Sequence, residues 1–138
     1  MIRPDFTGDW RELPVSTLAY IGDAVYELYV RLSLCRRSVF NSGELHRQAI
    51  RLVKASAQAE GAKTILPLLN EAEDAIFRRG RNSQPSSHSK SADPVDYRMA
   101  TGLEALIGYL YLNNQEERLL QLMQILVEEK HNVQTEQS

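Results

Sequence analysis

Apolar residues recur at steps of three and four along most of the chain, which is the spacing of a helix with one buried face. This spacing predicts a first helix over residues 15–33, preceded by Pro14, which suits the first turn of a helix. Its apolar positions are Leu18, Ile21, Val25, Leu28 and Leu32. Clean alternation and Asn-Gly or Asp-Gly turns, which indicate strand hairpins, do not occur. The pattern therefore predicts an all-α fold, a bundle of five to seven helices.

Residues that cap helices divide the middle of the chain. Asn41-Ser-Gly-Glu44 resembles a capping box and predicts a second helical region through about residue 60, which Gly61 can end with a left-handed cap. Pro67 then forces a break. Asn70-Glu-Ala-Glu73 is a further capping box, and it predicts a short helix with Gly80 just past its end.

The last third of the chain begins with a helix start at Asp93-Pro94. That helix is expected to run to about residue 113, and Asn114 to cap a last helix whose tail frays from about residue 130. Residues 80–93 are polar, rich in serine and without an apolar anchor, which predicts a flexible loop. The whole chain, 1–138, is expected to be a single domain with its core at about 13–127.

Composition narrows the class of protein. At 138 residues, with 43% hydrophobic and 25% charged residues, the chain is an ordinary globular domain with no apolar run that approaches the length of a membrane span. Its first residues carry acids and no apolar segment, unlike a signal peptide. The lone Cys35 excludes an internal disulfide and a cysteine-based zinc site, and we expect it to be buried near a helix end. These features favour a cytoplasmic protein.

The charge distribution is uneven. The net charge is −2, yet residues 36–100 hold eleven basic groups against seven acids, while the segments on either side are acidic. Such asymmetry can create a local basic surface that the total conceals. An ordinary solvated helical face explains the same pattern, so both interpretations stay open here.

Two acids stand in otherwise apolar helices, each beside glycine. Asp23 follows Gly22 in the first helix, and Glu104 lies between Gly102 and Gly108 in the helix that starts at residue 94. Glycine permits close approach of two backbones, so the helices could cross here with the two carboxylates facing each other. Such a pair repels, and a divalent cation such as Mg²⁺ or Mn²⁺ would relieve the repulsion. The alternative is a solvated acid, or one paired with Arg31 or Arg98.

At these residues the sequence resembles the ribonuclease III catalytic domain. The stretch Tyr20-Ile-Gly-Asp-Ala-Val-Tyr26 is similar to the signature helix of that family, and Glu104-Ala-Leu-Ile-Gly108 to its second acidic motif. The similarity is closer still to the mini-ribonuclease III family, which lacks a domain for binding double-stranded RNA. Further blocks that resemble this family are His46-Arg47-Gln-Ala, Arg78-Arg-Gly-Arg-Asn82, Asp96-Tyr-Arg98 and Thr101-Gly-Leu-Glu-Ala105.

The resemblance implies a helical homodimer that cuts double-stranded RNA with Mg²⁺ and matures the ends of the large-subunit (23S) ribosomal RNA precursor. Asp23 and Glu104 match the catalytic metal ligands. Two further acids of the larger ribonuclease III pattern are replaced here by Ala19 and Thr101, as in the mini family. We therefore expect one tightly held ion per subunit, with Mn²⁺ able to substitute.

Duplex RNA is recognised mainly through its phosphates and 2′-hydroxyls, which requires spaced cations. The candidate contacts are Arg78, Arg79, Arg81 and Lys90 at the polar loop, and Arg47 and Arg51, which with Lys54 form a stripe on the second helical region. For the stripe, a solvated face remains the alternative. The role of His46, in the core or on phosphate, is left open.

Two other functions remain possible at this point. One is a ribonuclease III-like module that has lost catalysis and serves RNA binding or ribosome assembly. The other is a helical dimerisation protein without an RNA role.

Overall fold

The computed structural model describes residues 4–37, 41–83 and 93–137, and the side chains of Arg37 and of residues 128–137 are not described. Within these ranges the fold is all-α, as predicted, and no strand is present. The helices are α1 (Val15–Arg37), α2 (Ser42–Val53), α3 (Ala55–Ile65), α4 (Glu71–Arg81), α5 (Pro94–Leu112) and α6 (Glu116–Gln137), with short 3₁₀ turns at Trp10–Glu12 and Leu66–Leu68. None of the described helices is long and apolar enough to cross a membrane.

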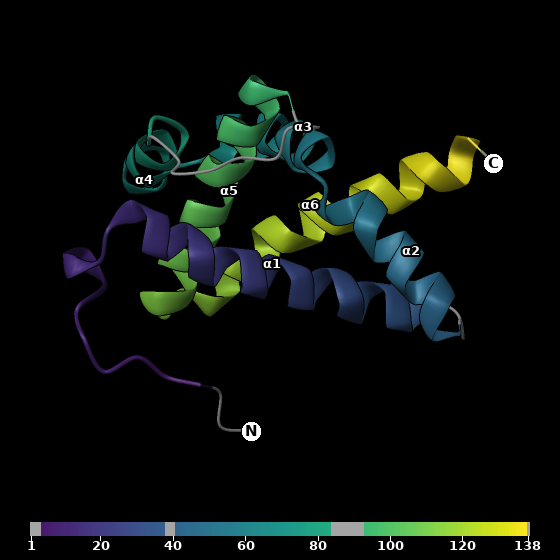
Figure 1. Ribbon diagram of the computed structural model, residues 1–138, viewed down its shortest axis with the longest axis horizontal. Helices are drawn as coiled ribbons and strands as arrows, with labels where there is room; N and C mark the ends of the chain where they lie inside the picture. The colour runs from purple at the N-terminus through teal and green to yellow at the C-terminus, as the bar shows by residue number, and fades with distance from the viewer. Residues whose placement is uncertain (1–3, 38–40, 84–92, 138) are drawn as a thin grey trace.

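Helix α5 is the centre of the bundle. It lies between α3 and α4, and α1 crosses it (Figure 1). Nearly all of its residues from Ala100 to Leu110 are buried, because this stretch carries no charge except that of Glu104. The core is completed by the apolar faces of the surrounding helices, with Tyr26 and Phe77 as its largest fully buried side chains. The chain is thus wrapped around one apolar helix.

Two glycines let α1 and α5 touch backbone to backbone. A Cβ atom placed on Gly22 would overlap the carbonyl oxygen of Glu104, and one placed on Gly108 would overlap the carbonyl oxygen of Leu18. No side chain fits at either position, so only glycine permits this crossing. The predicted crossing of the two helices at their glycines is therefore confirmed.

Two other glycines, Gly61 and Gly80, do not have the helix-ending role that the sequence predicted. Gly61 and Gly80 were expected to end helices in a left-handed conformation, but both are buried inside helices, and no described glycine has a positive φ. At Gly80 a Cβ atom would lie 2.8 Å from the Cβ of Ala105 and 3.0 Å from the Cα of Gly102. Gly80 therefore serves helix packing, because α4 approaches α5 closely at this position.

The second helical region is two helices rather than one. Lys54 has an extended conformation (φ −66°, ψ 155°), which ends α2 at Val53 and starts α3 at Ala55. The predicted helical region extends further than expected, to Ile65, and it contains a break that was not predicted because Lys54 carries no local signal for one. The break predicted at Pro67 is confirmed as the 3₁₀ turn Leu66–Leu68.

The predicted caps at Asn41, Asn70 and Asp93 are confirmed, each with its side chain accepting a backbone N–H. Asn114 is different, because it does not cap α6, which starts at Glu116. With φ 58° it ends α5 in a Schellman-type turn, in which the Gln115 N–H donates to the Leu110 carbonyl at 2.9 Å. Asparagine tolerates the left-handed conformation better than most residues, so it can replace the usual glycine here.

The predicted polar loop at 80–93 falls mostly outside the described residues, although α4 extends helical structure to Arg81. The first helix is longer than expected and reaches Arg37. The backbone of α6 is helical to Gln137, and the fraying of the tail stays a prediction.

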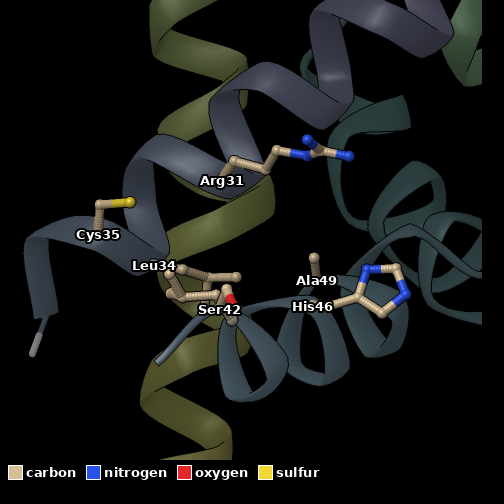
Figure 2. A pocket seen from close by; sticks show the side chains of 7 residues that line it. Arg31, Leu34, Cys35, Ser42, His46 and Ala49 are labelled. Atoms are coloured by element: carbon tan, nitrogen blue, oxygen red, sulfur yellow. The ribbon is translucent and has the colours of Figure 1, made fainter. Parts of the chain in front are cut away.

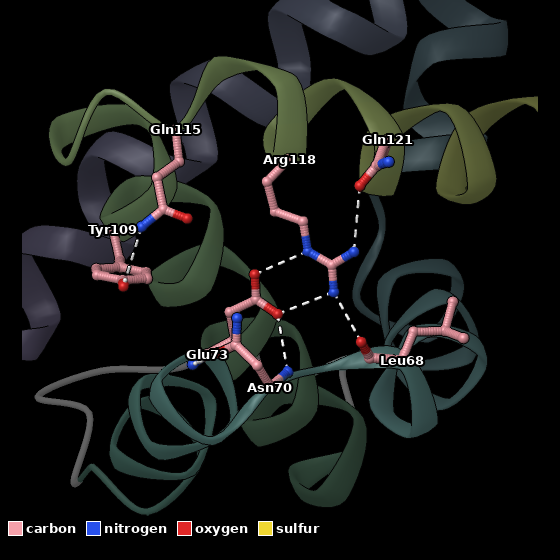
Figure 3. A network of polar contacts seen from close by, with 7 residues as sticks. All are labelled: Leu68, Asn70, Glu73, Tyr109, Gln115, Arg118 and Gln121. Atoms are coloured by element: carbon pink, nitrogen blue, oxygen red, sulfur yellow. Dashed lines mark hydrogen bonds and ion pairs between the residues drawn. The ribbon is translucent and has the colours of Figure 1, made fainter.

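A buried ion pair joins α4 to α6. Glu73 is fully buried, and its carboxylate accepts hydrogen bonds from Arg118 Nε at 2.8 Å, Arg118 Nη2 at 2.9 Å and the Asn70 N–H at 3.0 Å. Arg118 Nη2 also donates to the Leu68 carbonyl at 2.7 Å (Figure 3). Burial alone would raise the pKa of Glu73, but the hydrogen bonds from Arg118 and Asn70 and the Arg118 charge together lower it.

The helix crossing generates a first prediction. Gly22→Ala is expected to destabilise the protein by several kcal/mol, because its Cβ meets backbone that cannot rotate away. Gly43→Ala is the matched control, since a Cβ there meets nothing closer than 3.5 Å and alanine favours a helix by up to about 1 kcal/mol. Urea unfolding measures both changes, and equal stabilities of the two variants would contradict the proposed role of Gly22.

The ion pair generates a second prediction. Arg118→Met leaves the Glu73 carboxylate buried without its partner and is expected to cost about 3–5 kcal/mol. The control Lys63→Met removes an exposed partner of Glu60 at 3.5 Å and is expected to cost less than about 1 kcal/mol. Denaturant unfolding compares the two, and a similar small loss in both would show that the buried pair is not a major stabiliser.

Candidate metal centre

A cavity of about 610 Å³ opens where α1, the corner between α2 and α3, and the N-terminal half of α5 meet. Four of its lining residues are acids and one, Lys54, is a base. The lining consists of Asp23, Val53, Lys54, Ala55, Ser56, Gln58, Asp93, Asp96, Tyr97, Ala100 and Glu104. The cavity is thus an acidic pocket at the crossing of the two glycine-bearing helices.

Asp23 and Glu104 lie against each other in this cavity. The crossing places the Glu104 backbone on Gly22, so the neighbouring Asp23 side chain comes within hydrogen-bonding range of the Glu104 carboxyl group. Burial, together with the hydrogen bond to Asp23 and the charge of Asp23, raises the pKa of Glu104 to about 9. The pair therefore holds a proton at neutral pH, and Arg31, an alternative partner for Asp23, pairs with Glu27 at 3.0 Å instead.

The donor set of the pocket fits a divalent cation of the Mg²⁺ or Mn²⁺ type. Both acids offer hard oxygen ligands, and a cation in place of the shared proton removes their repulsion. Within the described ranges, no group of three or more His, Cys, Asp or Glu side chains could hold a metal ion. The residues present thus fit a cation that draws its remaining ligands from other oxygens, in agreement with the loss of acids at Ala19 and Thr101.

Asp93 and Asp96 also line the pocket, although the sequence indicated neither as a site residue. Asp93 Oδ1 caps α5 by accepting from the N–H groups of Val95 at 2.8 Å and Asp96 at 3.3 Å. Both acids add negative charge to the cavity wall. The fold brings these two acids to the cavity, because the N-terminus of α5 lies beside the corner between α2 and α3 at Lys54.

The described candidate RNA contacts lie on two helices, α4 and α2, and α2 ends at the cavity. On α4, Arg78 and Arg79 are exposed and Arg81 is half-buried, and Arg78 forms an ion pair with Asp74 at 2.8 Å. On α2, Arg51 is exposed, and Arg47 is exposed and paired with Glu44 at 2.7 Å. Lys90 lies outside the described residues.

A second cavity, of about 300 Å³, lies between the C-terminal part of α1 and α2 (Figure 2). His46 lines it and is exposed, so this histidine is not part of the core. Cys35 also lines it and is exposed, which overturns the expectation of a buried cysteine. The expectation was wrong because α1 continues past Cys35 and turns this position to the surface.

Comparisons with known proteins agree with this geometry. Residues 16–115 match the Ribonuclease III domain family. The chain is 49% identical to a mini-ribonuclease 3 from Symbiobacterium thermophilum, over 81% of this chain and 86% of that protein. It is 46% identical to one from Brevibacillus brevis, over 90% and 92%. A crystal structure of a protein from Fusobacterium nucleatum is similar with a TM-score of 0.79 and 29% identity, over 90% of this chain and 99% of that one.

The acid pair generates a pH prediction. Because the folded protein raises the pKa of Glu104 to about 9, it binds this proton more tightly than the unfolded chain does. The free energy of unfolding is therefore expected to fall as the pH rises from about 5 to 9, by up to about 1.4 kcal/mol per pH unit from this group. Glu104→Gln removes the titrating group and is expected to flatten this dependence.

Denaturant unfolding in the presence of a chelator, at several pH values, measures the difference between wild type and Glu104→Gln. The difference isolates Glu104 from other titrating groups. Parallel stability curves for the two proteins would show that Glu104 does not hold a proton in the folded state.

Proposed function

Since this chain belongs to the ribonuclease III family, among the mini-ribonucleases III, and is an endoribonuclease, we propose that it hydrolyses double-stranded RNA with Mg²⁺, for which Mn²⁺ can substitute. Asp23 and Glu104 are the proposed metal ligands and catalytic residues. The observation that carries this proposal is that two carboxylates pair at a helix crossing that only glycine permits. Folding gains nothing from the charge of Glu104, because burial opposes it.

A divalent cation, when bound, lowers the pKa of a water molecule and neutralises charge on a phosphodiester. Asp23 and Glu104 would hold it, and Glu104 must first release its proton to do so. Lys54, which lines the same cavity, would attract a phosphate oxygen. The cavity thus offers anionic and cationic walls to a single phosphodiester group.

We assign the RNA contacts to the cations of α2 and α4. Arg51 and Arg47 lie one and two turns before Lys54, so the basic stripe of α2 leads into the cavity. Arg78, Arg79 and Arg81 occupy the last turns of α4, and the sequence adds Lys90 as a further proposed contact. Such an arrangement suits the backbone of a duplex, which is recognised by its shape and phosphates.

The proposed assembly is a homodimer that associates through α1. Exposed apolar residues recur every four positions along this helix. Tyr20 is 77% exposed, Leu28 56% and Leu32 52%, and Ala24, which lies between Tyr20 and Leu28, is also exposed. A row of this kind on one helix face is typical of a protein–protein interface. One site per subunit would then allow the pair to cut both strands.

The proposed substrate is the precursor of 23S ribosomal RNA in the bacterial cytoplasm, as the resemblance to mini-ribonuclease III implies. An inactive RNA-binding or ribosome-assembly module is the second candidate. The acid pair argues against it, because a protein that only binds RNA would be expected to lose two carboxylates that repel both each other and the phosphate backbone.

The catalytic assignment predicts that wild type cuts duplex RNA only with Mg²⁺ or Mn²⁺. Asp23→Asn is expected to slow cleavage by about a hundredfold or more, the loss that follows from several kcal/mol of transition-state stabilisation. Glu60→Gln, an exposed carboxylate on α3, is the control and is expected to cut as fast as wild type.

Gel analysis of a labelled duplex measures the rates, and circular dichroism verifies the fold of each variant. Folded Asp23→Asn that cuts like wild type would refute the catalytic role. Wild type that shifts the duplex but never cuts it would favour the binding module. A wild type that neither cuts nor shifts the duplex at low salt would favour a dimerisation protein.

The assembly predicts that Leu28→Lys weakens the dimer at least about tenfold, because an unpaired ammonium group is costly to bury. Leu68→Lys, at an equally exposed leucine (50%) outside α1, is the control and is expected to associate like wild type. Sedimentation equilibrium measures both. A wild type that stays monomeric at micromolar concentration, or a Leu28→Lys variant that associates like the control, would contradict assembly through α1.

A further inference from the structure

Gln58 is a buried polar residue in the wall of the acidic cavity. It belongs to α3, its side chain is only 3% exposed, and it lines the cavity together with Asp23 and Glu104. Its Nε2 donates a hydrogen bond to the Val53 carbonyl at 2.8 Å. Its Oε1 is buried and has no hydrogen-bond partner, which is true of no other buried side-chain polar atom that the structure describes.

The orientation of this amide is fixed by its surroundings. A flipped amide would place Oε1 against the Val53 carbonyl oxygen, and two acceptors repel. The corner between α2 and α3 is also held from α1, because the buried Tyr26 hydroxyl donates to the preceding carbonyl, that of Leu52, at 3.1 Å. The Gln58 side chain is therefore locked with its donor on the corner and its acceptor left over.

A buried acceptor left over in this way is unfavourable relative to a satisfied one. A surface glutamine could turn to solvent, but Gln58 is enclosed. A group that binds in the cavity and needs an oxygen ligand would remove the cost. The same cavity holds the acid pair, whose repulsion a cation would also remove.

We propose that Oε1 of Gln58 is the third protein oxygen of the cation site, facing the ion beside the carboxylates of Asp23 and Glu104. This inference rests on the proposed function, since it deepens the description of the same site. Mg²⁺ and Mn²⁺ take about six oxygen ligands, and an amide oxygen is among those they accept. A neutral oxygen adds a ligand without adding a third negative charge to a pair that already repels.

A purely structural role is the competing explanation, in which Gln58 serves only to hold the Val53 carbonyl through Nε2. Two substitutions separate the roles. Gln58→Met removes both the donor and the acceptor, whereas Gln58→Glu removes the donor and keeps an oxygen at Oε1. A role in cation binding predicts opposite effects of the two changes, and a role at the corner predicts the same effect.

The test is titration of Mn²⁺ into the full-length protein at pH 8, in the absence of RNA, followed by calorimetry and by the electron paramagnetic resonance signal of free Mn²⁺. Wild type, Asp23→Asn, Gln58→Met and Gln58→Glu are compared, with circular dichroism as the check of folding. Gln58→Met is expected to bind Mn²⁺ about tenfold or more weakly, as for other residues that support a metal site. Gln58→Glu is expected to bind more tightly than wild type.

Wild-type affinity in Gln58→Met, or equal weakening in both Gln58 variants, would overturn the inference. If Asp23→Asn still loses Mn²⁺ binding in that case, the proposed function stands without Gln58. If wild type itself binds no Mn²⁺, neither the metal site nor this inference stands. Should Gln58→Met not fold, Gln58→Glu decides alone, because tighter binding supports the inference and unchanged or weaker binding overturns it.

Discussion

The contact between the backbones of α1 and α5 at Gly22 and Gly108 is the constraint on which the rest of this structure depends. It brings an apolar helix into the centre of the bundle, where the remaining helices pack around it. It also leaves no room to separate Asp23 from Glu104 by a side chain. The same backbone contact therefore determines both the close packing of the core and the closeness of the two acids, so a change in one would alter the other.

This arrangement carries an electrostatic cost that the fold does not relieve by itself. Glu73 shows how the same protein treats a structural carboxylate, which it surrounds with donors from Arg118 and Asn70 until the pKa falls. Glu104 is in the opposite situation, because burial, together with the hydrogen bond to Asp23 and the charge of Asp23, raises its pKa to about 9. The contrast separates a carboxylate that stabilises the fold from one that we propose as a ligand of a cation.

The sequence was sufficient for the fold class and for most helix starts, because apolar spacing and caps at Asn41, Asn70 and Asp93 are local signals. It also singled out Asp23 and Glu104, since an acid beside glycine in an apolar helix is conspicuous. It failed where the deciding contact is distant. The roles of Gly80 and of Gln58, and the pairing of Arg118 with Glu73 across 45 residues, depend on neighbours that only the folded chain provides.

Helix α1 is a single rod of 23 residues, about 34 Å long at 1.5 Å per residue. Asp23 and the exposed row from Tyr20 to Leu32 are fixed on this same rod. In the proposed dimer, the two proposed metal sites would be joined through rigid helices, with no loop or hinge between each site and the exposed row. The offset between the nicks on opposite strands would then depend on the geometry of two packed α1 helices rather than on a flexible segment.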